Sequence, residues 1–195
     1  GRTEENTLAG LLALRYPEIK GVGEPLELPN STVVDRPGVV HRLDRETSGV
    51  MVLAKNKEMF EWLKRQFQSR EVKKTYNAFV YGRLKEGTGT IDLPIGKSRS
   101  DFRLWSAEGR ARGDLREAVT EYRVLMFGKE ACFLEVSPQT GRTHQIRVHL
   151  KAIHYPVVCD KRYAPKRPCI LGFTRLALHA RNNPSRYEIA RFAGQ

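Results

Sequence analysis

The chain has 195 residues, enough for one sizeable domain and too few for two ordinary ones, so we expect a single domain over residues 1–195. Hydrophobic residues make up 40% and charged residues 29%, and every apolar run is far shorter than the ~20 residues of a membrane span, which excludes a transmembrane protein and favours the cytoplasm. Thirty-four Lys and Arg against twenty-two Asp and Glu give a net charge of +12, which favours a polyanionic partner such as a nucleic acid.

The three cysteines and five histidines show no metal-binding spacing. None of Cys132, Cys159 and Cys169 stands in a CxxC pair, and any disulfide scheme leaves one of them unpaired, so all three are expected to be reduced. No HExxH motif or Cys/His cluster occurs either. We therefore expect no zinc site and no other metal.

The N-terminal part predicts two helices separated by a loop and a strand. Leucines at helical spacing over residues 7–16 predict a short helix. Residues 21–37 are rich in Gly and Pro, which predicts a loop, and the apolar run 50–54 predicts a buried strand. Residues 56–70 predict a second helix with Asn56 as its N-cap.

The remainder alternates strands with one further helix. Residues 74–81 predict a strand, 85–114 an exposed and mobile excursion, and 117–127 with 130–136 a hairpin. A last helix, with Thr143 as a possible N-cap, is expected to end at Pro156. Strands interleaved with isolated helices and joined by hairpins predict an α+β fold with a largely antiparallel sheet.

A strongly polar run, residues 41–49, lies between two apolar segments. This position favours a loop at the end of a sheet, which is a common place for an active site. Within the run Asp44 is flanked by Arg42 and Arg45, and nearby cations favour an ionised carboxylate. The alternative is a capped turn with a surface ion pair that contributes little to stability.

A second polar run covers residues 141–149 and opens the last helix. Arg142 and Arg147 lie at opposite ends of its first turns. Such a helix start could bind phosphate, or one arginine could reach a buried carboxylate with two hydrogen bonds. An ordinary basic surface helix is the alternative.

Tyr76 lies in the predicted strand 74–81. A single strand tyrosine is more often part of a core than of an active site. Its candidacy as a catalytic residue therefore depends wholly on the two polar runs.

Together these segments resemble a known family. HRLDRETSGVMVLAK at 41–55, KKTYNAFVYG at 73–82 and GRTHQIRVHL at 141–150 are similar to the three motifs of RluA-family pseudouridine synthases, in the family's order. The likeness extends over roughly residues 37–180 and includes 154–163 as a supporting segment. It implies the pseudouridine synthase catalytic fold, a mixed and bent sheet flanked by helices with a central active-site cleft.

The resemblance assigns roles to five residues. Asp44 matches the essential catalytic aspartate, and Arg147 the basic residue that pairs with it. Tyr76 matches the tyrosine that stacks on the target base and assists the proton step. Arg42 would fill the gap left by the flipped nucleotide or hold that nucleotide, and Ile146 would pack beside the base.

The implied activity is the isomerisation of uridine to pseudouridine in ribosomal or transfer RNA, with base flipping of a uridine in a stem-loop. The reaction involves no oxidation or hydride transfer, so we expect no cofactor. No protein partner is required, and a monomer is the simpler expectation. The residues expected to contact the RNA or the target nucleotide are His41, Arg42, Arg45, Thr47, Lys73, Lys74, Arg142, His144, Gln145 and Ile146.

The sequence departs from the family pattern in several places. A strand that usually precedes the first motif, with a segment like NKP, is not found, and neither is an S4 RNA-binding domain. Polar residues replace the family's last apolar strand, of which 187–192 could be a remnant. Cys159 stands where glycine is common. These differences affect the expected stability and substrate more than the chemistry.

Two other function classes are compatible with these residues. A non-catalytic RNA-binding or RNA-chaperone protein that retains the fold would explain the charge. A nucleosidase or glycosidase that uses Asp44 would need a second carboxylate, for which Glu46 is the nearest candidate in the sequence.

Overall fold

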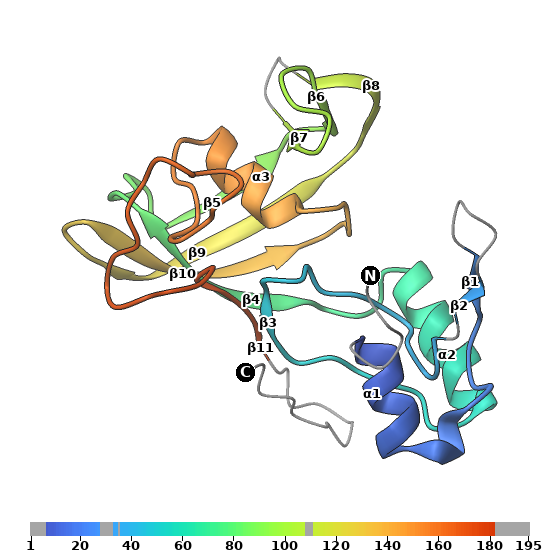
Figure 1. Cartoon of the computed structure of the whole chain (residues 1–195). Helices are drawn as coiled ribbons and strands as arrows, with labels where there is room; N and C mark the ends of the chain where they lie inside the picture. The colour runs from blue at the N-terminus through green and yellow to red at the C-terminus, as the bar shows by residue number, and fades with distance from the viewer. Residues whose placement is uncertain (1–6, 28–32, 35, 108–110, 182–195) are drawn as a thin grey trace. The chain divides into compact units, whose positions relative to one another are not determined.

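The computed structural model describes residues 7–27, 33–34, 36–107 and 111–181 (Figure 1). The chain divides into two compact units, which are described in turn. The first contains the described residues up to 42 together with 51–72, and the second contains 43–50 and 73–181. No helix within these described residues is long and apolar enough to cross a membrane.

The first unit is mainly helical. It contains α1 (Leu8–Arg15), a 3-10 turn η2 (Pro17–Ile19) and α2 (Lys57–Gln68), which confirms both predicted helices. The expected loop between them includes a short antiparallel hairpin of β1 (Leu26–Glu27) and β2 (Val33–Val34).

Helix α2 begins where its sequence predicts. The side-chain oxygen Oδ1 of Asn56 accepts a hydrogen bond of 2.8 Å from the backbone N–H of Met59, which satisfies one of the free donors of the first turn. Phe60 and Leu63 lie one helical turn apart and are buried against Ala54. The N-cap and the apolar stripe together fix where α2 starts and which face it buries.

Substitution of Asn56 by alanine is expected to lower the free energy of unfolding by about 1 kcal/mol, because the N–H of Met59 loses its acceptor. Asn56→Ser is the matched control, since serine also caps helices well. Chemical denaturation of the three proteins measures the difference. Equal losses in both variants would show that the cap does not stabilise α2.

A six-stranded sheet forms the centre of the second unit. Its strand order is β3-β11-β4-β10-β9-β5. Only β3 and β11 are parallel, and the four other neighbouring pairs are antiparallel. The strands are β3 (Ser48–Gly49), β11 (Leu178–Arg181), β4 (Thr75–Tyr81), β10 (Ala131–Pro138), β9 (Val119–Phe127) and β5 (Thr88–Asp92). The predicted α+β fold with a largely antiparallel sheet is confirmed, as are the strand at β4 and the β9–β10 hairpin.

Helix α3 (Gln145–Ala152) lies against β9 and β10 in Figure 1. Its residues 145–150 are all buried, so this short helix has no solvated face over its first turns. Ile146 and Leu150 join the core that Ala78 and Val80 of β4 also line. Such a helix can place polar side chains in a water-poor site, provided that each has a partner.

The segment expected to be an exposed and mobile excursion, 85–114, contains strands, and most of its described residues are exposed or half-buried. Strand β5 pairs with β9 at the edge of the main sheet. A separate three-stranded sheet, β7-β6-β8, follows it, with β6 (Ile95–Ser98), β7 (Trp105–Ser106) and β8 (Ala111–Arg116). Ile95 of β6 is buried in a small apolar cluster with Val148 of α3 and with Tyr163, and the sequence did not predict this cluster because its members are far apart in the chain.

The buried strand expected at 50–54 is also not formed. Strand β3 ends at Gly49, whose φ of +124° turns the chain out of the sheet, and Val50 adds only one hydrogen bond to Ala180. Leu53 forms an isolated antiparallel bridge with Val39 in the first unit. Residues 51–54 of the apolar run belong to the first unit, whereas Val50 and β3 belong to the second.

Two local predictions in the second unit are corrected. Thr143 does not cap α3, because His144 occupies the N-cap position with a left-handed backbone, φ 57° and ψ 21°, and makes no side-chain capping bond. Cys159 and Cys169 form a disulfide, with Cα atoms 4.8 Å apart, while Cys132 is free and buried. The turn between the two paired cysteines brings them together, and their spacing in the sequence gave no sign of it. The strand remnant expected at 187–192 lies outside the described residues.

Candidate active site

Asp44 lies in a tight turn that leads into β3. The backbone N–H of Thr47 donates a hydrogen bond of 2.9 Å to the carbonyl oxygen of Asp44 and closes the turn. Ser48, the next residue, pairs with His179 of β11 in the parallel ladder, and their side chains are 2.9 Å apart. The loop that carries the carboxylate is thus fixed to the sheet at its C-terminal end, and the Asp44 side chain is 18% exposed.

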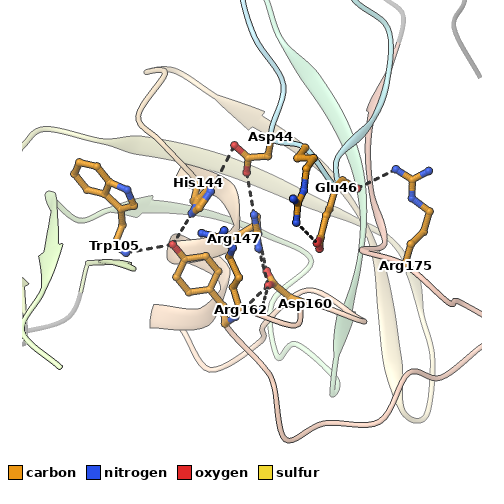
Figure 2. Close-up of polar contacts among 10 residues, drawn as sticks. Asp44, Glu46, Trp105, His144, Arg147, Asp160, Arg162 and Arg175 are labelled. Carbon is orange, nitrogen blue, oxygen red and sulfur yellow. Dashed lines mark hydrogen bonds and ion pairs between the residues drawn. The ribbon is translucent and has the colours of Figure 1, made fainter. Parts of the chain in front are cut away.

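Arg147 joins two carboxylates from different parts of the chain, as Figure 2 shows. Its Nη1 donates to Oδ2 of Asp44 at 3.2 Å. Its Nε and Nη2 donate to the two carboxylate oxygens of Asp160, each at 2.8 Å. The guanidinium is therefore held by a bidentate pair on one side and presents one N–H to Asp44 on the other.

This cluster is almost dry, and its hydrogen bonds offset the cost of burying charge. The side chains of Arg147 and Asp160 are 3% and 0% exposed. Asp160 also accepts the backbone N–H groups of Arg162 and Tyr163, both at 3.0 Å. Burial by itself lowers the pKa of Arg147, but the hydrogen bonds and charge of Asp160, followed by those of Asp44, raise it above its ordinary value. Arg147 remains a cation throughout the working pH range.

His144 and Tyr163 lie on the other side of Asp44. Nδ1 of His144 is 2.8 Å from the hydroxyl oxygen of Tyr163, and Nε2 is 3.9 Å from Oδ1 of Asp44. Burial lowers the pKa of His144 from its ordinary value of 6.5. Burial raises the pKa of Tyr163, in contrast, to about 12. Both side chains are neutral at physiological pH.

Tyr76 lies on β4, opposite Val136 of β10 and Ala180 of β11. Burial raises the pKa of Tyr76, and the negative charge of Asp44 raises it further. The phenol is therefore a hydrogen-bond donor at neutral pH. The structure thus brings together the three side chains singled out as catalytic candidates, Asp44, Tyr76 and Arg147.

Two other predicted site residues, Gln145 and Ile146, are buried in contact with the surrounding structure. Gln145 is 4% exposed, and its side-chain amide accepts from Thr140 and donates to Thr120 and to the carbonyl of Val119. It ties the start of α3 to β9. Ile146 packs in the main core.

The remaining basic candidates lie around the two polar runs. Nε of Arg142 donates to the carbonyl of Glu117 at 3.0 Å, and Nζ of Lys74 donates to the carbonyl of Thr140 at 3.0 Å. Lys73 is exposed. Arg45 is exposed and lies 3.6 Å from Glu46.

His41 and Arg42 belong to the first unit. Nε2 of His41 accepts a hydrogen bond of 2.9 Å from the N–H of Val52, and its ring stacks on Phe67. These contacts give His41 a structural role within the first unit, since its side chain holds Val52 and Phe67 together. Arg42 is exposed.

Sequence reasoning missed two residues of the site, Asp160 and Tyr163. Both lie in the segment 154–163 that supported the family resemblance, but neither was assigned a role. The available signal was an acidic residue at the end of an apolar run, which is unusual unless a cation pairs with it. Only the fold shows that the cation is Arg147.

The profile of a protein family, described as RNA pseudouridylate synthase, matches residues 23–152. The chain therefore belongs to the RNA pseudouridylate synthase family, which confirms the resemblance carried by the three motifs.

Individual relatives agree with this assignment. An RNA pseudouridine synthase of Chloroflexus aurantiacus, named as uncharacterized, is 45% identical over 89% of this chain and 50% of its own length. Ribosomal large subunit pseudouridine synthase D of Xanthomonas campestris is 43% identical over 78% of this chain and 48% of its own. Human RNA pseudouridylate synthase domain containing 1, a solved structure, superposes with a TM-score of 0.71 at 29% identity and covers 91% of this chain and 68% of that one. The chain spans about half the length of the curated relatives that it matches.

Proposed function

We propose that this chain is the catalytic part of an RNA pseudouridine synthase that isomerises specific uridines in structured ribosomal or transfer RNA, with Asp44 as the catalytic carboxylate. One observation carries the proposal. In a member of the RNA pseudouridylate synthase family, a buried arginine held by Asp160 presents a single N–H to the partly exposed carboxylate of Asp44. This arrangement orients one carboxylate and leaves it partly exposed.

These residue types fit the chemistry. The bond from C1′ to N1 must break, the uracil must turn, and a bond from C1′ to C5 must form, while C5 loses a proton and N1 gains one. Asp44 can attack C1′, add to C6, or remove the 2′ proton to give a glycal, and each route needs an ionised carboxylate beside the target nucleoside. Asp44 then accepts the C5 proton, and the protonated phenol of Tyr76 assists as a hydrogen-bond donor.

Base flipping brings the target uridine to this site. The flipped base loses its stacking in the RNA, which costs a few kcal/mol and is offset by new contacts with the enzyme. Tyr76 would stack on the base, and Arg42 would occupy the gap in the RNA. Exclusion of water prevents hydrolysis, which would release uracil and leave an abasic site.

The RNA backbone requires a basic surface outside the dry cluster. Lys73 is exposed beside β4, and the small sheet β6–β8 carries further cations. Nζ of Lys97 lies 4.2 Å from the ring centre of Trp105, in a hollow also lined by Arg112 and Arg116. Cations beside an aromatic ring suit phosphate contact and base stacking, so this sheet would help to select the RNA.

The contacts of the carboxylates are less compatible with a glycoside hydrolase than with a pseudouridine synthase. A hydrolase would need a second carboxylate that is free to act on the substrate. Both oxygens of Asp160 are bonded to Arg147, and the side chain of Asp160 is fully buried. The side chain of Glu46 lies by Arg45.

The test is release of tritium from transfer and ribosomal RNA whose uridine is tritiated at C5. The native chain is expected to release tritium, and Asp44→Asn to release none while its affinity for the RNA stays within about twofold, because the substitution removes charge without changing shape. RNA binding with no tritium release by the native chain would favour the non-catalytic RNA-binding protein. Release of free uracil would favour the hydrolase.

A further inference from the structure

A chain of polar contacts runs from the small sheet to Asp44 (Figure 2). The backbone N–H of Trp105, in β7, donates to the hydroxyl oxygen of Tyr163 at 3.3 Å. That hydroxyl lies 2.8 Å from Nδ1 of His144, and Nε2 on the opposite side of the same ring faces Oδ1 of Asp44 at 3.9 Å. Nothing in the proposed reaction so far uses His144 or Tyr163.

One hydrogen-bond direction in this chain is fixed by its donor. A backbone N–H can only donate, so the oxygen of Tyr163 accepts from Trp105. The pKa of Tyr163 is raised to about 12, so its hydroxyl keeps its hydrogen at neutral pH. Nδ1 of His144 lies 2.8 Å from that hydroxyl oxygen and is placed to accept this hydrogen. When the hydroxyl donates to Nδ1, the neutral ring carries its hydrogen on Nε2.

We propose that His144 is a positioning residue for Asp44, held by Tyr163 in the Nε2–H tautomer so that a neutral donor faces Oδ1. The proposal rests on the function proposed above. Arg147 already holds Oδ2, so a second donor at Oδ1 fixes the plane of the carboxylate toward the ribose. The distance of 3.9 Å is too long for a hydrogen bond and closes to about 2.9 Å in the substrate complex, as such contacts commonly tighten on binding.

The charged surroundings of His144 predict how activity depends on pH. The groups that face its ring are Asp44, Arg147, Asp160, Arg162 and Tyr163. Burial is the largest effect and lowers the pKa of His144, the two arginines lower it further, and the two aspartates oppose them. Protonation would also place a hydrogen on Nδ1, against the hydroxyl hydrogen of Tyr163.

The sign of the pH effect follows. At a pH above the pKa of His144 the ring is neutral, and the reaction rate is at its maximum. As the pH falls through that pKa, the imidazolium binds the Asp44 carboxylate as an ion pair and the rate decreases. We therefore expect the rate to decrease at low pH because His144 becomes protonated. This decrease is the acid limb of the pH profile.

The tautomer can be measured without any assay of activity. Long-range proton–nitrogen correlation spectra of the full chain with ¹⁵N-labelled histidine distinguish the two neutral tautomers, and the His144→Gln spectrum assigns the signal among the five histidines. We expect the Nε2–H form at neutral pH. The Nδ1–H form, or a protonated ring, would overturn the proposal even if the chain is an active synthase.

Kinetics on three variants test the positioning role. His144→Leu should lower kcat about 10- to 100-fold with little change in KM, the factor expected for one hydrogen bond to a charged group. His144→Gln should recover at least part of that loss, because its amide can donate, and should lack the acid limb. Tyr163→Phe should shift the limb to higher pH, because the hydroxyl no longer opposes protonation of Nδ1.

Each contrary outcome is informative. An unchanged kcat in His144→Leu, or an acid limb that persists in His144→Gln, would overturn the role of His144. Tritium release from no RNA by the native chain would instead overturn the proposed function, and the spectra would still decide the tautomer.

Discussion

Replacement of Arg147 by methionine is expected to abolish measurable synthase activity and to lower the free energy of unfolding by about 3–5 kcal/mol. The methionine keeps the apolar volume of the side chain but removes three hydrogen bonds, two to Asp160 and one to Asp44. Asp160 is then a fully buried carboxylate without its cation, which is the source of the destabilisation. Asp44 loses the donor that orients it. Urea denaturation and tritium release measure the two losses separately.

A double variant, Arg147→Met with Asp160→Leu, distinguishes folding from catalysis. Apolar replacement of a whole buried ion pair is often neutral for stability, so part of the lost stability should return. The return is incomplete because the backbone N–H groups of Arg162 and Tyr163 lose their acceptor. Activity should not return, because Asp44 still lacks its arginine. Recovery of activity in the double variant would show that Arg147 acts only through folding.

Substitution of Gly49 by alanine is expected to have a comparable effect on stability. Gly49 has a φ of +124°, and a Cβ atom there would overlap backbone atoms of Ala180 on the paired strand β11. The strands must separate, so we expect a loss of about 2–4 kcal/mol, within the range for strained or overpacked sites. Activity should fall as well, because β3 fixes the loop that carries Asp44.

Gly113→Ala is the matched control for that prediction. Gly113 also has a positive φ, +72°, but an added Cβ would meet nothing within 4 Å. Its cost should be limited to the backbone strain of about 1 kcal/mol. Denaturation midpoints of the two variants measure the difference. Equal losses would show that the close approach of β3 and β11 contributes nothing.

Features with a strong local pattern could be predicted from the sequence. Helix α2 combines an N-cap at Asn56 with an apolar stripe, and β4 alternates side chains between two covered faces. The β9–β10 hairpin is marked by Gly128 between two strand-like segments. In each case the signal and the structure depend on residues that are neighbours in the chain.

Features that depend on distant partners could not be predicted. The run 50–54 is apolar enough for a strand, but Gly49 turns it away from the sheet. The apolar cluster around Ile95 joins the small sheet to Val148 of α3 and to Tyr163, which are distant in the sequence. His144, rather than Thr143, is the N-cap of α3; its backbone is left-handed, and its ring contacts Tyr163.

The catalytic candidates themselves were predictable only through their motifs. Nothing in the local sequence pairs Asp44 with Arg147, or indicates that Asp160 holds the arginine in place. A two-carboxylate cluster around one guanidinium is a property of the folded chain alone.

Asp44 and Asp160 share one guanidinium, that of Arg147. The cluster of these three residues therefore carries one surplus negative charge in a nearly dry environment. In the proposed reaction, this surplus charge would attract a ribose that becomes electron-poor at C1′ and would repel the uracil ring as the ring takes up the electrons of the broken bond. An uncharged donor would then have to stabilise the departing ring, and the Tyr76 phenol, whose pKa is raised, keeps its hydrogen and could serve. Under the proposed function, the charge of the cluster would thus favour cleavage of the glycosidic bond, while retention of the base would depend on the tyrosine.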